Sequence, residues 1–148
     1  MDALIQNHAL TALFLLSFLA STLVPLGSEW LLVALLVKGF PAQALVLTAT
    51  LGNTLGACTT YAVGVWGSTL LIDRVLRLDR SRVEQAMRLY GRYGVWSLLL
   101  SWLPVIGDPL CLAAGLMRLA FPRFAGLVLL GKFARYAILA VITAQTLV

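Results

Sequence analysis

The sequence predicts an all-α integral membrane protein, and three observations carry this prediction. The composition is 61% hydrophobic and only 11% charged, which is far more apolar than that of a soluble domain. Four long apolar stretches cover about residues 9–37, 42–72, 94–117 and 121–148. Each is long enough to cross the roughly 30 Å hydrocarbon layer as a helix. Two of the four contain the same helix-breaking pattern.

The first and third apolar stretches are interrupted, whereas the second and fourth are continuous. In both interruptions an acid follows a proline by four residues, with a glycine between them: Pro25, Gly27 and Glu29 in the first, and Pro104, Gly107 and Asp108 in the second. The backbone groups that proline and glycine free from a helix must be satisfied by protein or by water in a cavity. Each broken stretch therefore predicts a re-entrant hairpin that faces the protein interior, although two full crossings remain an alternative.

The starts of the second half-helices have residues that predict N-terminal caps. Asp108 precedes Pro109, and aspartate before a first-turn proline is a strong helix start with the aspartate as N-cap. Ser28 and Glu29 form a weaker version of the same signal.

The broken stretches belong to a repeat with a period of about 79, which is the separation of Glu29 and Asp108. After each acid come a basic residue, Lys38 or Arg118, a turn that contains proline, and an unbroken apolar helix. We therefore expect two inverted repeats, about residues 9–72 and 94–148, each a re-entrant broken helix hairpin plus a transmembrane helix. Together with the linker they form a single membrane domain, residues 1–148.

The linker, about residues 73–92, is rich in arginine. It holds six of the eleven basic residues, namely Arg74, Arg77, Arg80, Arg82, Arg88 and Arg92. This charge distribution predicts a cytoplasmic linker, and its apolar residues predict an amphipathic surface helix that begins near Asp79 or Ser81. The net charge of +5 does not indicate nucleic-acid binding, because no soluble scaffold would present the arginines.

The second apolar stretch carries a small residue at every fourth position: Thr48, Gly52, Gly56, Thr60, Gly64 and Ser68. Such a ridge predicts close packing against another helix, and a substrate groove is the alternative. Asn53 on the same helix is a candidate for a hydrogen bond across that interface. Cys58 and Cys111 lack the paired spacing of metal ligands, so no metal and no cofactor is expected.

Four charged residues within the apolar stretches are the main site candidates. Glu29 and Asp108 are proposed proton- or substrate-coupling groups, because a carboxylate near the bilayer centre costs about 2.5–3.5 kcal/mol. A capping role at the positive end of a half-helix is the alternative. Lys132 and Arg135 share one helical face with Tyr136 alongside, and we expect them to pair with the acids or to bind an anionic headgroup. Arg118 is a secondary candidate.

With these residues identified, nearly the whole chain resembles the DedA superfamily, also called the SNARE-associated or VTT-domain family, and most closely its short YqaA-like branch. The resembling segments are Pro25 with Ser28 and Glu29, Thr48 to Thr50 with Gly52, Asn53 and Gly56, Leu99 to Trp102 with Pro104, Gly107 and Asp108, Ala114 with Gly115, and Gly131 and Lys132 with Arg135 and Tyr136. The resemblance implies inverted re-entrant hairpins, a bacterial inner-membrane location, and movement of lipids between leaflets. Bacterial relatives are associated with proton-dependent translocation of polyprenyl phosphates, and eukaryotic relatives with phospholipid scrambling.

The chain departs from the pattern of larger DedA proteins at three positions. Their second hairpin has the pattern Arg-Phe-x-Pro-x-x-Arg, and its arginines fall here on Ser101 and Gly107. They also carry an acid where this chain has Ala57. The hairpin acid that the resemblance carries over is Glu29, and Arg135 or Lys132 is the candidate replacement for the missing cations.

These observations favour a membrane transporter or scramblase that moves a polyprenyl phosphate or a phospholipid between leaflets. A proton antiporter for small ions or cationic drugs and a non-transport membrane scaffold are the alternatives. An enzyme is not expected, because no catalytic constellation is visible. The expected partners are membrane lipids, with a homodimer left open, and neither nucleic acid nor a soluble substrate is expected.

Overall fold

The computed structural model describes residues 2–22, 27–67, 79–103 and 106–146, and within them the chain is helical, with no strand. The prediction of an all-α fold is thus confirmed for this part of the chain. The elements are α1 (Asp2–Ala20), α2 (Glu29–Val37), α3 (Ala42–Trp66), α5 (Arg80–Tyr93), the 3-10 helix η2 (Gly94–Trp102), α6 (Gly107–Leu116) and α7 (Phe121–Thr146).

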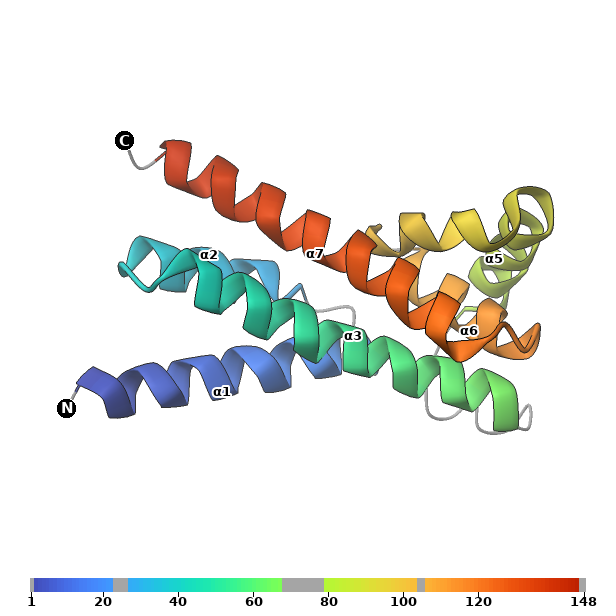
Figure 1. Cartoon of the computed structure of the whole chain (residues 1–148), viewed down its shortest axis with the longest axis horizontal. Coiled ribbons are helices and arrows are strands. Elements are labelled where there is room, and N and C mark those ends of the chain that lie inside the picture. The colour runs from blue at the N-terminus through green and yellow to red at the C-terminus, as the bar shows by residue number, and fades with distance from the viewer. Residues whose placement is uncertain (1, 23–26, 68–78, 104–105, 147–148) are drawn as a thin grey trace.

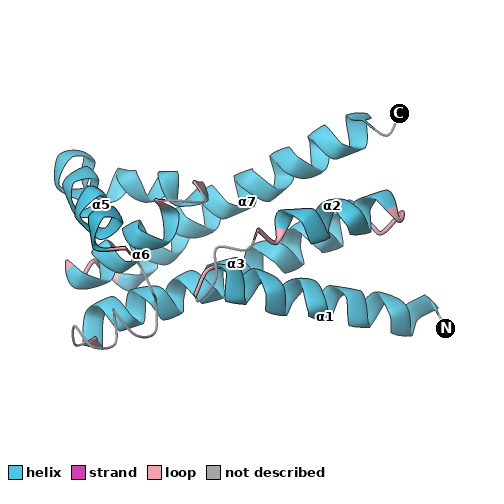
Figure 2. Ribbon diagram, turned by 180° about the vertical axis from the view of Figure 1, so that it is seen from behind, coloured by secondary structure: helices cyan, strands magenta, loops and turns pink. Residues whose placement is uncertain are grey.

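Two bent pairs of helices enter the molecule from opposite ends (Figure 1). Helix α1 runs from the end that holds both termini towards the middle, and α2 returns to that end. The pair η2 and α6 makes the corresponding excursion from the other end, where α5 lies. The long helices α3 and α7 connect the two ends, as the view from behind also shows (Figure 2).

The two pairs pack in corresponding ways on the long helices α3 and α7. Helix α1 packs on α3 as η2 packs on α7, and α6 packs on α3 as α2 packs on α7. The long helices α3 and α7 pack on each other. One element departs from this correspondence: α5 packs on α6 and η2, and among the described elements α1 and α2 have no counterpart of it.

Helices α2 and α6 end with the same hydrogen-bond pattern. Gly39 and Arg118 follow their last turns in the left-handed conformation, with φ of 85° and 51°. The N–H groups of the next residues, Phe40 and Leu119, each donate to the carbonyl five residues back, at 3.1 and 3.0 Å. The two left-handed positions lie 79 residues apart, the period found in the sequence. Arg118 therefore adopts a backbone that normally favours glycine in order to end α6 as α2 ends.

The starts of these helices differ from the prediction that Asp108 is an N-cap. Helix α6 begins at Gly107, one residue before Asp108, and the residue in the cap position is Ile106, which makes no side-chain cap hydrogen bond. The Asp108 carboxylate instead accepts a hydrogen bond from Ser21 at 2.9 Å. At the start of α2, Ser28 occupies the cap position, also without a cap hydrogen bond. The prolines of the breaks, Pro25 and Pro104, lie outside the described residues.

The small-residue ridge of α3 is a packing surface, as its spacing predicted. A Cβ added at Gly52 or Gly56 would lie 2.5 Å from the carbonyl oxygens of Phe14 and Phe18 in α1. Further along α3, a Cβ added at Gly64 would lie 3.0 Å from the Cα of Gly115 in α6. The glycines therefore let α3 approach one helix of each pair at backbone contact. Ser68 lies outside the described residues.

The long helices α3 and α7 differ in how well their length and hydropathy suit a membrane span. Helix α7 has 26 residues and a mean hydropathy of 1.8 in its best window, and it is the one described helix that is long and apolar enough to span a membrane by these criteria. Helix α3 has 25 residues, but polar residues such as Asn53 and Thr54, which are buried, lower its mean hydropathy.

The linker contains the amphipathic helix that the sequence predicted. Helix α5 begins at Arg80, and the Asp79 side chain caps it by accepting from the Ser81 N–H at 3.2 Å. Ala86 is buried, whereas Arg88 and Arg92 are exposed. Residues 73–78 of the linker lie outside the described residues.

Replacing Gly56 by alanine should destabilise the protein by about 1–3 kcal/mol, because α1 and α3 would have to separate. Thermal unfolding in detergent measures this change. Gly126→Ala in α7 is the matched control: an added Cβ there meets no atom within 4 Å, and alanine favours a helix over glycine by about 1 kcal/mol. Equal melting temperatures for the two variants would contradict the backbone contact between α1 and α3.

Candidate functional site

The turns of the two helix pairs bring both candidate acids to the middle of α7. Glu29 is the first residue of α2, and Asp108 is the second residue of α6. Ser21, just after α1, donates its hydroxyl hydrogen to Asp108, so the end of α1 and the start of α6 lie next to each other. Lys132 and Arg135 lie in α7. One site therefore contains the four charged residues that the sequence singled out.

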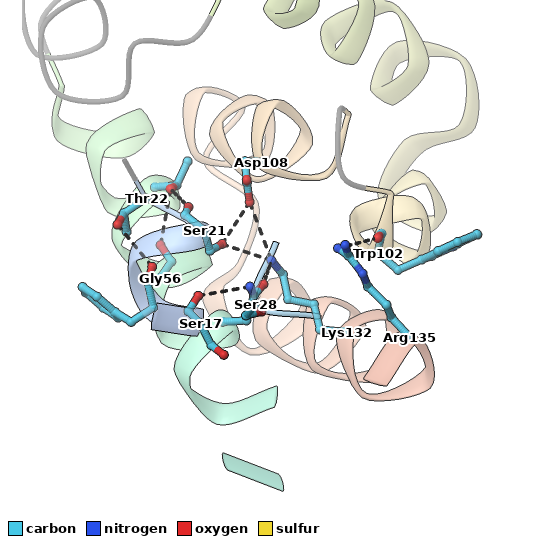
Figure 3. Close-up of polar contacts among 12 residues, drawn as sticks. Ser17, Ser21, Thr22, Ser28, Gly56, Trp102, Asp108, Lys132 and Arg135 are labelled. Atoms are coloured by element: carbon cyan, nitrogen blue, oxygen red, sulfur yellow. Dashed lines mark hydrogen bonds and ion pairs between the residues drawn. The ribbon is translucent and has the colours of Figure 1, made fainter. Parts of the chain in front are cut away.

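Lys132 is the most buried charged group of the site, with 4% of its side chain exposed. Its ammonium lies 3.6 Å from the Asp108 carboxylate and donates to Ser21 Oγ at 3.0 Å and to the side-chain oxygen of Asn53. Ser21 thus accepts from the lysine and donates to the aspartate, as Figure 3 shows. Asn53 is held in turn by its amide, which donates to the Ser17 carbonyl at 3.1 Å. The network satisfies the buried charge with groups from α3, from α6 and from the residue just after α1.

Arg135 forms the second ion pair, with Glu29. It also donates from Nη1 to the Trp102 carbonyl at 2.9 Å, which is visible on the right of Figure 3. Both side chains are more exposed than Lys132, at 20% for Arg135 and 27% for Glu29. Arg135 therefore links the start of α2 to the end of η2, while Lys132 links the turn after α1 to the start of α6.

A cavity of about 620 Å³ lies between these ion pairs, a volume typical of small-ligand sites. Its walls include the four charged side chains together with Gly27, Ser28, Asn53 and Ser101. Trp102 and Ile138 also line it, and they are 44% and 59% exposed. The cavity thus combines a charged interior with apolar side chains that reach the outer surface.

Not every predicted site residue lines the cavity. Tyr136 is buried, and its hydroxyl is 2.5 Å from that of Ser28, which orients the start of α2 on α7. Arg118 is exposed at the end of α6 and lies outside the cavity wall. Gly107 is buried where α6 starts, close to the Ser101 carbonyl. Among the described residues no group of acids, histidines and cysteines is arranged to hold a metal.

Two serines belong to the site although the sequence did not predict them as site residues, and Ser101 was noted only as the position of a missing arginine. Ser21 mediates between Lys132 and Asp108, and Ser101 is 2% exposed in the cavity wall. The Ser101 hydroxyl has no hydrogen-bond partner among the residues that the structure describes. Ser17 and Ser21 are four residues apart in an otherwise apolar stretch, and this spacing could have indicated a polar face on α1.

Comparison with known proteins identifies the family. Residues 24–145 match the VTT domain. The chain belongs to the VTT-domain family, also called DedA. It is similar to the inner membrane protein YqaA of Escherichia coli (strain K12) and of Shigella flexneri, with 43% identity over 138 residues, which cover 93% of this chain and 92% of each relative. A protein of Haemophilus influenzae is 38% identical over 144 residues, which cover 90% of this chain and 87% of that protein. No solved structure matches.

Lys132 and Arg135 of α7 both contact the second helix pair. Arg135 donates to the carbonyl of Trp102 at the end of η2. Lys132 lies 3.6 Å from the carboxylate of Asp108 in α6. The expectation that one of these cations replaces arginines of the second hairpin stays a prediction.

Replacing Lys132 by methionine should destabilise the protein by roughly 3 kcal/mol, because the largely buried Asp108 carboxylate would lose its cation. Adding Asp108→Asn should recover part of that loss, since no unpaired charge remains. Unfolding of the four proteins of this double-mutant cycle in detergent measures the coupling. Losses that simply add would contradict an interaction between the two side chains.

Proposed function

We propose that this VTT-domain protein is a transporter or scramblase that moves a lipid with an anionic headgroup, a polyprenyl phosphate or a phospholipid, between leaflets. The headgroup occupies the central cavity. Arg135 and Lys132 bind its phosphate, and Glu29 and Asp108 exchange partners and protons as it passes.

The observation that carries this proposal is the pair of ion pairs in a cavity with an apolar outer wall. A phosphate needs cationic donors, and the planar guanidinium of Arg135 can give two parallel hydrogen bonds. The Ser101 hydroxyl, which has no hydrogen-bond partner within the described part of the chain, supplies a further donor in the same wall. Intramembrane charges that face a cavity commonly mark the pathway of a substrate or ion.

The exposed apolar side chains of the cavity wall favour a lipid over a soluble anion. Trp102 and Ile138 reach the outer surface beside the charged interior. An acyl or prenyl chain can therefore stay in the hydrocarbon layer while its headgroup enters the cavity. A soluble anion would gain nothing from that apolar edge.

We further propose that the two bent helix pairs are re-entrant hairpins of an inverted repeat in the bacterial inner membrane. The shared spacing of 79 residues, the matching helix ends and the entry of the pairs from opposite ends of the molecule support this arrangement. The inner-membrane location follows the name of the YqaA relatives. With its arginines, α5 then faces the cytoplasm.

The carboxylates of the cavity also support a second candidate, a proton-coupled antiporter of small cations. Glu29 and Asp108 are each about one quarter exposed, enough for a cation to reach them. Cation-dependent quenching of a pH-sensitive dye in the same vesicles would favour this function. A membrane scaffold would show neither activity.

Glu29→Gln and Asp108→Asn should each abolish leaflet exchange of labelled polyprenyl phosphate or phospholipid in reconstituted vesicles. Membrane insertion should persist, because the amide keeps the size of the side chain and lowers its burial cost. Arg135→Lys should slow exchange about tenfold, the equivalent of one charge-assisted hydrogen bond. Arg88→Gln, on the exposed face of α5, is the control and should exchange lipid normally.

Two results would reject lipid transport through this site. Unmodified protein that moves neither lipid faster than empty vesicles would exclude the activity. Normal exchange by both amide variants would show that the carboxylates are structural, with transport following another route.

A further inference from the structure

Asn53 and Lys132 occupy equivalent positions in the two halves of the chain. They are 79 residues apart, the period that also relates Glu29 to Asp108, and their side chains are hydrogen-bonded to each other. Two residues at equivalent positions of two repeats can contact each other only close to the pseudo-two-fold axis that relates the repeats. The Lys132 ammonium therefore lies near this axis, where both hairpin acids are within similar reach.

The two acids nevertheless use different cations in this structure. Asp108 is paired with Lys132, whereas Glu29 is paired with Arg135. The repeat position of Arg135 in α3 is Gly56, which has no charge. The two cations lie three residues apart on α7, which is about 4.5 Å along its axis at 1.5 Å per residue.

The returning helices of the two pairs, α2 and α6, pack differently on the long helices. Helix α6 meets α3 at backbone contact between Gly115 and Gly64, and α5 packs on its other side. Helix α2 meets α7 through apolar side chains, with Leu32 and Leu35 in one cluster with Tyr136 and Ala140, and through the hydrogen bond between Ser28 and Tyr136. The repeat positions of the glycine pair are Leu36 and Thr143, so α2 and α7 lack the glycine contact that α6 and α3 make. Helix α2 is therefore the one that a shift along its long helix would disturb least.

We propose that Lys132 is a counter-ion shared by both hairpin acids. It pairs with Asp108 in the state seen here and with Glu29 after α2 has moved one helical turn along α7, a kind of shift that packed helices are known to make. Glu29 then leaves Arg135, whose guanidinium becomes available to an anionic headgroup. This inference rests on the proposed transport function, since it explains how the cavity exchanges an internal ion pair for its cargo.

Zero-length cross-linking tests the shared counter-ion with native side chains. A membrane-permeant carbodiimide joins a lysine amine to a carboxylate in contact with it, whereas arginine forms no such amide. Treated protein in vesicles should give two products, 108–132 and 29–132, identified by mass spectrometry of the cross-linked peptides. In the Asp108→Asn variant the 29–132 product should become the only product at Lys132. Lys132→Arg, which keeps the charge but removes the amine, is the control and should lose both.

The outcomes separate this inference from the proposed function. Absence of the 29–132 product in both the unmodified protein and Asp108→Asn would overturn the shared counter-ion, and so would absence of the 108–132 product from the unmodified protein. Both products together with no lipid exchange would retain the shared counter-ion and reject the lipid cargo. Lipid exchange with the 108–132 product alone would retain the lipid cargo and reject the shared counter-ion.

Discussion

Pairing of charge in an apolar interior is the constraint on which the rest of the structure depends. Helix α7 carries two cations one turn apart, and each finds an acid from a different hairpin. An unpaired buried charge is costly, so neither helix pair can leave α7 unless another partner replaces it. The two halves of the chain are thus joined by the same side chains that line the candidate site.

Backbone packing decides which part of the molecule is fixed. The glycines of α3 admit α1 at one end and α6 at the other at van der Waals contact of the backbones, whereas α2 rests on α7 through larger apolar side chains. Within the described part of the chain, helix α5 packs on the second helix pair alone. The two halves therefore have corresponding arrangements of helices, but the second pair is packed more tightly than the first.

Much of this could be predicted from the sequence, because period and composition act locally. The all-helical fold, the packing ridge around Gly56 and the start of α5 follow from residue type and spacing alone, whereas the inverted repeat stays a prediction. The partner of each charge could not be predicted, since Glu29 and Asp108 are equally plausible partners for Arg135 until the hairpins are placed in space. The expected N-cap at Asp108 was wrong because a hydroxyl and an ammonium from other helices attract the carboxylate more strongly than its own backbone. Ser21 was overlooked although its spacing of four residues from Ser17 is a sign of a polar face.

The side of the membrane on which each end of the molecule lies is the most direct test of the arrangement that brings the two acids together. Single cysteines in place of Asp2, Arg82 and Thr146, in a chain whose Cys58 and Cys111 are alanine, can be labelled in whole cells with an impermeant maleimide. Two re-entrant hairpins predict that positions 2 and 146 react from outside and position 82 only after the membrane is permeabilised. Reaction of all three positions from the same side would mean that the broken helices cross the membrane, and would contradict hairpins that meet at α7.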